Sequence, residues 1–265
     1  MSQRELQMEL YWYGNAFVVF CSSQQRLFFD PFHAQRYRGR ALPLPGKTVL
    51  VTHGHFDHVL SIPHICGSER CKVYGSNSSL YHLHLRDCQG IPLSAGSIVQ
   101  IGEFHITALK SDHVHFDAPL VVRTMKRILS QHKCNAAFQI LRTHLKHPAG
   151  SVFAYLVEVE QLQMLHLGSL HMPDTMSVQR PIDILCLPLQ GSSHWLKHSL
   201  DLLNRIRPRL VFVHHHDDAF PPITEEVDVD LLRNAMREKF PEMVLHVPQY
   251  GMVFDPNKLL KGSEK

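Results

Sequence analysis

The sequence lacks long apolar runs and carries little net charge. No stretch of the 265 residues approaches the roughly 20 consecutive apolar residues that a membrane-spanning helix needs. The polar beginning, Met1 to Glu5, has no apolar core of the kind found in signal peptides. A formal charge of +3 is too small to indicate nucleic-acid binding by itself. These absences predict a cytoplasmic protein without a nucleic-acid partner.

Closely spaced cysteine pairs are also missing. Six cysteines are scattered without C-x-x-C spacing, so we expect neither a disulfide framework nor a zinc ribbon. We expect free and mostly buried thiols at Cys21, Cys66, Cys71, Cys88, Cys134 and Cys186. The content of 44% apolar and 19% charged residues is typical of a folded globular chain. The length suffices for one large core, and we expect a single domain over residues 1–265.

Apolar periodicity predicts an alternation of strands and helices. The segments 10–20 and 26–29 are expected to form a hairpin, with turn signals at Gly14, Asn15 and 21–23. A strand pair is expected over 99–109, and single strands at 48–52, 152–159, 163–167, 183–189 and 209–213, with closing segments at 243–247 and 252–254. Helices are expected at 79–87, where Gly90 would close the helix, and at 195–207 and 230–240. The strand, helix and strand over 183–213 form a βαβ unit. The pattern therefore predicts two α/β halves that pack sheet on sheet.

One segment contains basic residues and no acidic ones. Between Asp117 and Glu158 the basic residues are Arg123, Lys126, Arg127, Lys133, Arg142 and Lys146, beside His132, His144 and His147. The apolar positions among them are spaced for one or two amphipathic helices at about 118–150. A solvated helical face explains such a charge run most simply. The alternative is a basic rim that attracts anionic substrates or a phospholipid surface, with peripheral membrane contact.

Three imidazoles and a carboxylate fall within six positions, at His53, His55, Asp57 and His58. They directly follow the β-branched, apolar run 47–52, which is typical of a buried strand. The donors therefore lie on a loop at the carboxyl end of a strand, where a rigid scaffold can direct them toward one point. Imidazole and carboxylate together suit zinc best, with manganese or iron as alternatives. This spacing predicts a metal site.

Further ligands are expected where other strands end. His113 follows the 99–109 strand region, with His115 as a nearby alternative, and the apolar strand 210–213 leads into His214, His215 and His216. Strand alternation directs only every second of these side chains to one face. The residues alone leave the choice within each group open.

The H-x-H-x-D-H pattern after a strand resembles the metallo-β-lactamase superfamily. Trp12, Tyr13 and Gly14 with Asp30 and Pro31 resemble the opening of the branch that contains ascorbate-6-phosphate lactonase and N-acyl phosphatidylethanolamine phospholipase D. The segment from His215 to Phe220 is similar to the closing H-(aromatic)-D-(D/N)-x-F motif of that branch. The resemblance implies an α/β fold, a four-layer αββα sandwich of two packed mixed sheets.

The resemblance also implies a ligand set. It assigns His53, His55 and His113 to one metal and Asp57, His58 and His215 to the other, with one or two zinc ions per chain. Asp30 is similar to a residue that orients a ligating histidine, although a plain turn residue before Pro31 is the alternative.

Two positions depart from the family pattern. Asn15 stands where many members have a histidine, and Ser169 stands where many have an aspartate that bridges both metals. A serine hydroxyl is a poor metal bridge, and without that carboxylate the two cations are less neutralised. We therefore expect the second metal to bind more weakly, or an anionic ligand to fill both sites.

These features predict a metal-dependent hydrolase that acts on an anionic small molecule or phospholipid, at a phosphodiester bond or a lactone or other ester bond. A metal-activated hydroxide would attack, with Asp57 holding the water or acting as general base. His171 and His194 are candidates to protonate a leaving group or hold the substrate, and surface loop histidines are the alternative. Two rival functions are a non-catalytic, metal-dependent ligand-binding protein and a redox di-iron protein, although no flavin or iron-sulfur signature is present.

Overall fold

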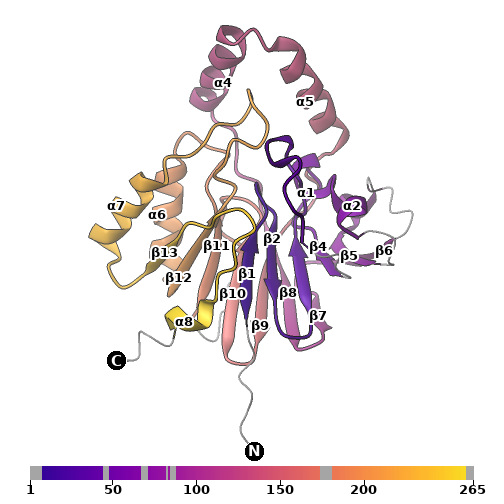
Figure 1. Ribbon diagram of the computed structural model, residues 1–265, viewed down its shortest axis with the longest axis vertical. Helices are drawn as coiled ribbons and strands as arrows, with labels where there is room; N and C mark the ends of the chain where they lie inside the picture. The colour runs from indigo at the N-terminus through magenta and orange to yellow at the C-terminus, as the bar shows by residue number, and fades with distance from the viewer. Residues whose placement is uncertain are drawn as a thin grey trace, which may run out of the picture.

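Two β-sheets lie face to face in the computed structural model, with helices outside them (Figure 1). The structure describes residues 8–43, 48–66, 71–81, 83, 88–173 and 181–260. The first sheet consists of β1 (Glu9–Trp12), β2 (Val18–Cys21), β3 (Arg26–Phe29), β4 (Thr48–Leu50), β5 (Cys71–Ser76) and β6 (Cys88–Leu93). The second sheet consists of β7 (Ile98–Ile101), β8 (Phe104–Ser111), β9 (Val152–Val159), β10 (Leu162–Leu167), β11 (Ile184–Pro188), β12 (Leu210–His214) and β13 (Val244–His246). In each sheet the strands are neighbours in chain order.

Both sheets are mixed. The pairs from β1 to β3 are antiparallel and those from β3 to β6 are parallel. In the second sheet the pairs from β7 to β10 are antiparallel and those from β10 to β13 are parallel. Because parallel neighbours need a crossover, the parallel part of each sheet carries the helices.

The helices form the outer layers and one projecting hairpin. They are η1 (Gln35–Tyr37), α1 (Phe56–Val59), α2 (Ile62–Cys66), α3 (Asn77–Tyr81), α4 (Ala118–Ser130), α5 (Cys134–Lys146), α6 (Trp195–Ile206), α7 (Val229–Lys239) and α8 (Pro256–Leu260). Residues of α1 and α2 pack on the first sheet, and residues of α6 and α7 pack on the second. This arrangement confirms the expected four-layer αββα sandwich.

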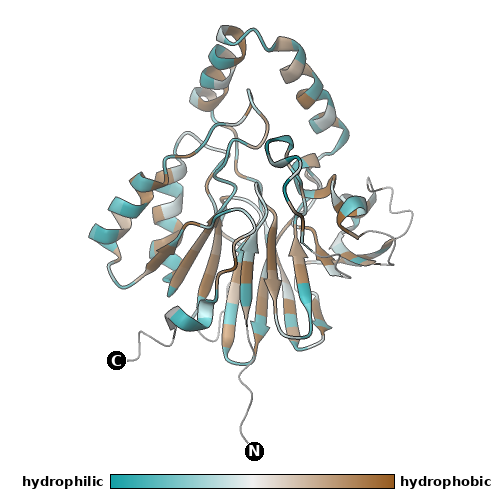
Figure 2. Ribbon diagram, viewed as in Figure 1, coloured by the Kyte–Doolittle hydropathy of each residue, from teal (hydrophilic) through white to brown (hydrophobic). Residues whose placement is uncertain are grey.

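Alternation along the strands builds the core. In β3, Leu27 and Phe29 belong to the cluster between the sheets, whereas Phe28 faces the helices α1 and α2. In β12 the odd-numbered and even-numbered residues divide in the same way between the two faces. Both faces of these strands are buried, which explains their continuous apolar sequences. Figure 2 shows the hydrophobic residues concentrated in the strands, with hydrophilic residues on the outward sides of α6 and α7.

Most expected elements are present, with shifts of one to three residues at their ends. The turn signal at Gly14 and Asn15 is confirmed, because a turn with positive φ at these two residues divides the segment 10–20 into the strands β1 and β2. The helix over 79–87 is wrong in part, because α3 covers Asn77–Tyr81 and Gly90 lies within β6 instead of closing a helix. Residues 82 and 84–87 of that prediction lie outside the described residues. The strand β6 tolerates Pro92 because it forms the edge of its sheet.

The cysteines are only partly as expected. Cys21, Cys134 and Cys186 are free thiols, but Cys66 and Cys71 form a disulfide. The end of α2 and the start of β5 place their Cα atoms 5.9 Å apart, a separation that disulfides commonly span. The expectation of six free thiols is therefore wrong, because the fold brings Cys66 and Cys71 together although their spacing in the sequence is not C-x-x-C.

The basic segment forms two amphipathic helices, α4 and α5, which project from one end of the sandwich (Figure 1). The helix α4 begins after Asp117, whose carboxylate accepts a hydrogen bond from the Leu120 N–H at 2.9 Å. This contact is a helix N-cap. Within the described ranges, no helix has the length and apolar character needed to cross a bilayer.

The turn at Gly14 gives a prediction for stability. A Cβ atom at this position, where φ is +90°, would lie 2.3 Å from the Tyr37 ring, whereas a Cβ at Gly39, where φ is +84°, would meet nothing within 4 Å. We expect Gly39→Ala to cost about 1–3 kcal/mol from backbone strain alone. Gly14→Ala should cost about 1–3 kcal/mol more, because the Tyr37 ring must move. Urea unfolding of both variants measures the difference, and equal losses would contradict this account.

Candidate metal centre

The candidate donors lie where strands of both sheets end. His53 and His55 follow β4, Asp57 and His58 lie in α1 directly after them, and His113 follows β8. The sixth donor, His215, follows β12 and has a φ of +50°. These strand ends bring residues from distant parts of the chain, from His53 to His215, to one edge of the sandwich.

His53, His55 and His113 form the first group. One ring nitrogen from each lies within 4.8 Å of the others. The Nε2 atom of His53 is 3.1 Å from Nδ1 of His55. The Nδ1 atom of His113 is 2.7 Å from the Val114 carbonyl oxygen, to which it donates, so its Nε2 keeps the lone pair. The group therefore offers imidazole lone pairs in the arrangement that a cation requires.

Burial keeps these three rings neutral. It holds the pKa of His53 well below the ordinary value, with neighbouring histidines acting in the same direction. Burial likewise lowers the pKa of His55 to about 3 and that of His113 to about 4. Because only a neutral imidazole can bind a metal, the first group is ready for a cation at neutral pH.

Asp57, His58 and His215 form the second group, whose donor atoms also lie within 4.8 Å of one another. The Oδ2 atom of Asp57 is 3.4 Å from Nε2 of His215 and 3.8 Å from Nε2 of His58. Asn15 donates from Nδ2 to this oxygen at 3.3 Å and to the Asp57 carbonyl at 2.9 Å. Burial raises the pKa of Asp57, but the facing histidines outweigh it and hold the pKa well below its usual range. Asp57 is therefore an ionised carboxylate.

A buried carboxylate stands behind this group. The Oδ2 atom of Asp30 is 2.9 Å from Nδ1 of His58, and Asp30 also accepts from the Thr52 N–H at 2.7 Å and the Thr52 hydroxyl at 2.6 Å. With Nδ1 held from behind, the His58 ring presents Nε2 toward Asp57. Burial raises the pKa of Asp30, yet His58 and His166 hold it below its usual range, so the carboxylate is ionised.

The side chains of the three consecutive histidines 214–216, at the end of β12 and directly after it, have different surroundings. His214 is fully buried and stacks on His166 at a centroid distance of 4.9 Å, and His216 stacks on Trp12 at 4.6 Å. Only His215 turns toward Asp57. Of the two histidines after β8, His113 joins the first group and His115 is exposed.

Ser169 supports the loop of the first group. Its hydroxyl accepts a hydrogen bond from the Val114 N–H at 2.8 Å. It therefore positions the backbone next to His113. Asp57 remains the single carboxylate within the two donor groups of the described residues.

His171 and His194 are not brought to the donor groups. Neither histidine is among the residues that line the cavity above the groups, although Ser169 and Ser192 are. His194 immediately precedes α6 and is exposed, which turns its side chain toward solvent.

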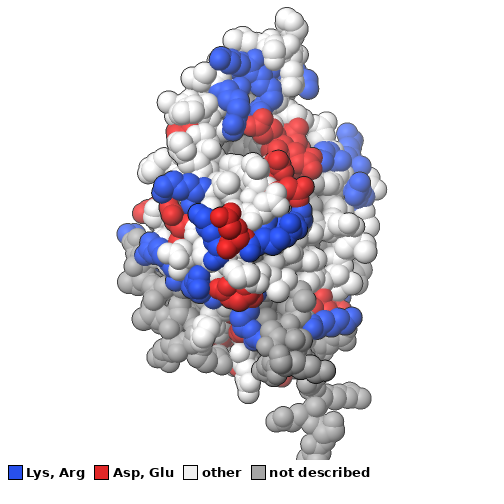
Figure 3. Space-filling model, turned by 90° about the vertical axis from the view of Figure 1, so that its left-hand side faces the viewer, with Lys and Arg blue, Asp and Glu red and all other residues white. Residues whose placement is uncertain are grey.

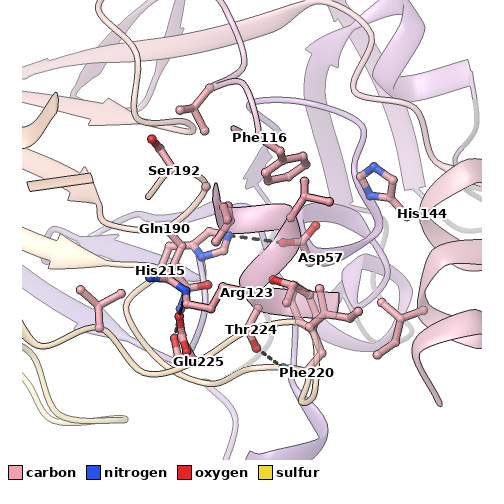
Figure 4. Close-up of a pocket in the computed structure, with 18 of the residues that line it drawn as sticks. Asp57, Phe116, Arg123, His144, Gln190, Ser192, His215, Phe220, Thr224 and Glu225 are labelled. Atoms are coloured by element: carbon pink, nitrogen blue, oxygen red, sulfur yellow. Dashed lines mark hydrogen bonds and ion pairs between the residues drawn. The ribbon is translucent and has the colours of Figure 1, made fainter. Parts of the chain in front are cut away.

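The cavity above the two groups has a volume of about 740 Å³. His55, Asp57, His58, His113 and His215 form its floor. Its walls are largely apolar and come mostly from α4 and α5, including Leu120, Val121, Met125, Ile128, Phe138, Ile140 and Leu141. Figure 4 shows Asp57 and His215 facing each other beneath Phe116, with His144 across the cavity.

Sequence reasoning missed the role of two residues at this floor. The family pattern marks Asn15 only as a departure, yet Asn15 donates a hydrogen bond to the Asp57 carboxylate. The sequence shows His144 only as part of the basic segment, yet α5 brings its ring centroid to 4.4 Å from that of His55. No spacing signal in the sequence links His144 to the motif, because a helix from a separate segment delivers it.

Two arginines of the basic segment fasten α4 to the body of the protein. Arg127 donates to the carbonyl oxygens of Pro222 and Ile223, both at 2.7 Å, and pairs with Glu225. Arg123 pairs with the same carboxylate at 2.9 Å. Lys and Arg gather over the end of the molecule that carries the two helices, and acidic residues lie next to them (Figure 3). Part of the basic charge is therefore used within the protein.

The family model of the β-lactamase superfamily domain matches residues 9–215, a span that contains all six donors. The chain belongs to the β-lactamase superfamily. A UPF0173 metal-dependent hydrolase of Myxococcus xanthus (strain DK1622) is 32% identical over 103 residues. That match covers 37% of this chain and 37% of the relative, which is much less than two thirds of the relative's length.

Solved structures resemble the whole sandwich. The metallo-β-lactamase fold protein YhfI from Bacillus subtilis has a TM-score of 0.62 at 15% identity, over 95% of this chain and 100% of that one. Igni18, a metallo hydrolase from Ignicoccus hospitalis KIN4/I, has a TM-score of 0.59 at 15% identity, over 94% and 97%. CmlA, a diiron β-hydroxylase from Streptomyces venezuelae, has a TM-score of 0.61 at 15% identity, over 96% of this chain and 55% of that one. At these identities the likeness establishes the metallo-β-lactamase fold alone.

Ser169 gives a prediction for metal content. After dialysis against metal-free buffer, we expect wild type to retain about one zinc ion per chain, because one carboxylate neutralises two cations poorly. Ser169→Asp should raise the retained content toward two ions, and the neutral, similarly sized Ser169→Asn should not. Elemental analysis measures these values. Two equally retained ions in wild type would show that the serine does not weaken the second position.

The neutral histidines give a prediction for pH dependence in chelated protein. His55 and His113 titrate near 6.5 when unfolded, but near 3 and near 4 when folded. Below pH 6.5 the unfolded chain therefore binds more protons, and stability falls as pH is lowered toward 4. At pH 5 the loss should be about 1–2 kcal/mol for each histidine.

Urea unfolding at pH 7.5 and pH 5 measures this loss. In the double variant His55→Gln, His113→Gln, the difference between the two pH values should shrink, because these two groups no longer titrate. A variant with the full wild-type pH dependence would show that other groups cause it.

Proposed function

We propose that this chain is a metal-dependent hydrolase that holds one or two zinc ions in its two donor groups. The observation that carries the proposal is the arrangement of six donors in two groups at the floor of one cavity. Imidazole and carboxylate donors in these proportions fit zinc, and manganese or iron are alternatives. The name of the Myxococcus xanthus relative, a metal-dependent hydrolase, supports the same reaction class.

His53, His55 and His113 would hold one ion, and Asp57, His58 and His215 would hold the other. When bound, such ions lower the pKa of a water molecule and polarise the bond that is attacked. Asp57, which Asn15 and His215 fix through Oδ2, would orient the attacking water and accept its proton. Asp30 would keep the His58 ring in its binding orientation.

The cavity favours an amphiphilic substrate. Its floor is polar and its walls are largely apolar, so a substrate with a hydrolysable group at one end and an apolar chain at the other would fit. Arg123 and Arg127 are already paired with Glu225, which leaves recognition of an anionic group mainly to the metal end. We infer a phosphodiester bond, or a lactone or other ester bond, in an anionic molecule that carries an acyl chain. Within the resembled branch, these walls favour a lipid over a sugar phosphate.

The rim of the cavity supports contact with a phospholipid surface as the source of such a substrate. Val122 and Leu145 are exposed and do not line the cavity. Lys126 lies one helical turn from Val122, and Arg142 lies one turn from Leu145. Apolar and basic side chains on one helix face suit an anionic membrane surface.

The substrate proposal predicts a dependence on chain length. We expect zinc-loaded protein to hydrolyse p-nitrophenyl phosphodiesters and acyl lactones, with kcat/KM rising roughly threefold to fourfold for each added methylene that enters the cavity. Asp57→Ala should lower the rate by about 10²–10⁴-fold, and chelation should abolish activity. Initial rates over chains of four to twelve carbons, a range of roughly the depth that such pockets enclose, measure both effects.

Two leucines of α5 provide a matched control. Leu141 lines the cavity and Leu145 does not, although both are exposed leucines on the same helix. Leu141→Ala should flatten the dependence on chain length, and Leu145→Ala should leave it unchanged. Tight binding of a long-chain compound that zinc-loaded protein never converts would favour a non-catalytic binding protein instead.

A further inference from the structure

Three cysteines meet on the first sheet. Cys66 ends α2, Cys71 begins β5 and Cys88 begins β6. In the parallel pair of β5 and β6, Cys71 and Cys88 stand directly opposite each other. The three sulfur atoms lie within 4.8 Å of one another. None of these residues lines the cavity above the histidines, so the cluster is a second, separate group of reactive side chains.

The cluster joins a disulfide to a third cysteine. Cys66 and Cys71 are bonded, Cys88 is outside the bond, and the Cys88 sulfur is 2.7 Å from the Cys71 sulfur. A thiolate displaces one sulfur of a disulfide by direct attack on the other, and the Cys88 sulfur is next to the one that it would attack. Cys71 is the central sulfur, which both partners reach.

Burial differs among the three sulfurs. Cys66 and Cys71 are 0% and 1% exposed, whereas Cys88 is half-buried. A thiol from solution therefore reaches Cys88 more readily than either sulfur of the disulfide. The other two buried cysteines form the reactive thiolate less readily, since burial raises the pKa of Cys21 to about 11 and also raises the pKa of Cys186.

We propose that Cys66, Cys71 and Cys88 form a thiol–disulfide relay, in which Cys88 carries the redox state of the solution to a buried disulfide. The Cys88 thiolate attacks the Cys71 sulfur, the bond between Cys71 and Cys88 forms, and the bond between Cys66 and Cys71 breaks. Cys66 leaves as a thiolate and takes up a proton. The number of disulfides is unchanged, so this step needs no external oxidant.

Reduction then proceeds from the accessible side. A small thiol such as glutathione attacks the Cys88 sulfur and releases the Cys71 thiolate, which leaves a mixed disulfide on Cys88. A second small thiol attacks that mixed disulfide, restores the Cys88 thiolate and departs as the oxidised dimer. Two external thiols thus supply the two electrons that reduce the original disulfide.

The relay changes which elements are cross-linked. The bond between Cys66 and Cys71 ties the end of α2 to β5, whereas the bond between Cys71 and Cys88 ties β5 to β6 and frees α2. The helix α2 follows α1, and Ile62 and Ile65 share an apolar cluster with Val59 of α1. The redox state therefore acts on the segment that immediately follows Asp57 and His58. The relay does not depend on the proposed hydrolase function.

Disulfide mapping tests the relay. Protein is quenched in acid during reduction by millimolar glutathione, alkylated, digested and analysed by mass spectrometry. In wild type we expect peptides linked through Cys71 and Cys88 to appear before full reduction. In Cys88→Ser, the bond between Cys66 and Cys71 should persist at least about tenfold longer, because direct attack on the buried sulfurs is hindered. In Cys66→Ser, air oxidation should produce the bond between Cys71 and Cys88.

Control variants separate the relay from direct reduction of the buried disulfide. Cys186→Ser removes a buried thiol elsewhere and should follow wild-type kinetics, and exposed Cys134 should be alkylated in every sample. Circular dichroism checks that each variant is folded. The wild-type time course tests the relay even if a variant does not fold. Reduction of Cys88→Ser at the wild-type rate, with no peptide linked through Cys71 and Cys88, would overturn the proposal. Zinc bound to all three sulfurs of reduced protein, lost in Cys88→Ser while no exchange occurs, would also overturn it in favour of a soft-metal site.

Discussion

The buried carboxylate of Asp30 connects the layers of this protein to its chemistry. Asp30 follows β3 and accepts hydrogen bonds from the backbone N–H and the hydroxyl of Thr52, which follows β4. It also lies against His58 of α1 and His166 of β10. An ionised carboxylate without any exposed surface is costly unless such partners surround it. The strands that supply these partners must therefore hold their register, and the orientation of the donor histidines depends on the packing of both sheets.

The sequence predicted the strands better than the contacts between distant segments. The strand expected at 152–159 has the same first and last residues as β9, and of the three consecutive histidines 214–216 only His215 faces Asp57. The strands β5 and β6 were missed. In β6, Gly90 and Pro92 disfavour a strand, and only its position at a sheet edge makes these two residues acceptable. The pairing of Cys66 with Cys71, the approach of His144 to His55 and the attachment of Arg127 to Glu225 depend on three-dimensional proximity, which periodicity does not encode.

Charge balance distinguishes this centre from a fully carboxylate-bridged one. The two donor groups contain five histidines and Asp57, and Ser169 is bonded to the backbone beside His113. The neighbouring Gly168 cannot carry a side chain, because a Cβ atom there would lie 2.1 Å from the Thr52 hydroxyl. The Ser169 hydroxyl thus supports the backbone beside His113. An anionic group of a ligand would complete the neutralisation of two cations.

The helices that wall the cavity enter and leave the sheet at adjacent points. Ser111, the last residue of β8, stands opposite Val152, the first residue of β9, so the whole α4 and α5 hairpin occupies the place of a single connection between paired strands. Loops at such positions tolerate insertion well. Evolution can therefore lengthen, shorten or replace this hairpin while the sandwich keeps its register, and specificity can diverge among relatives that share an unchanged scaffold.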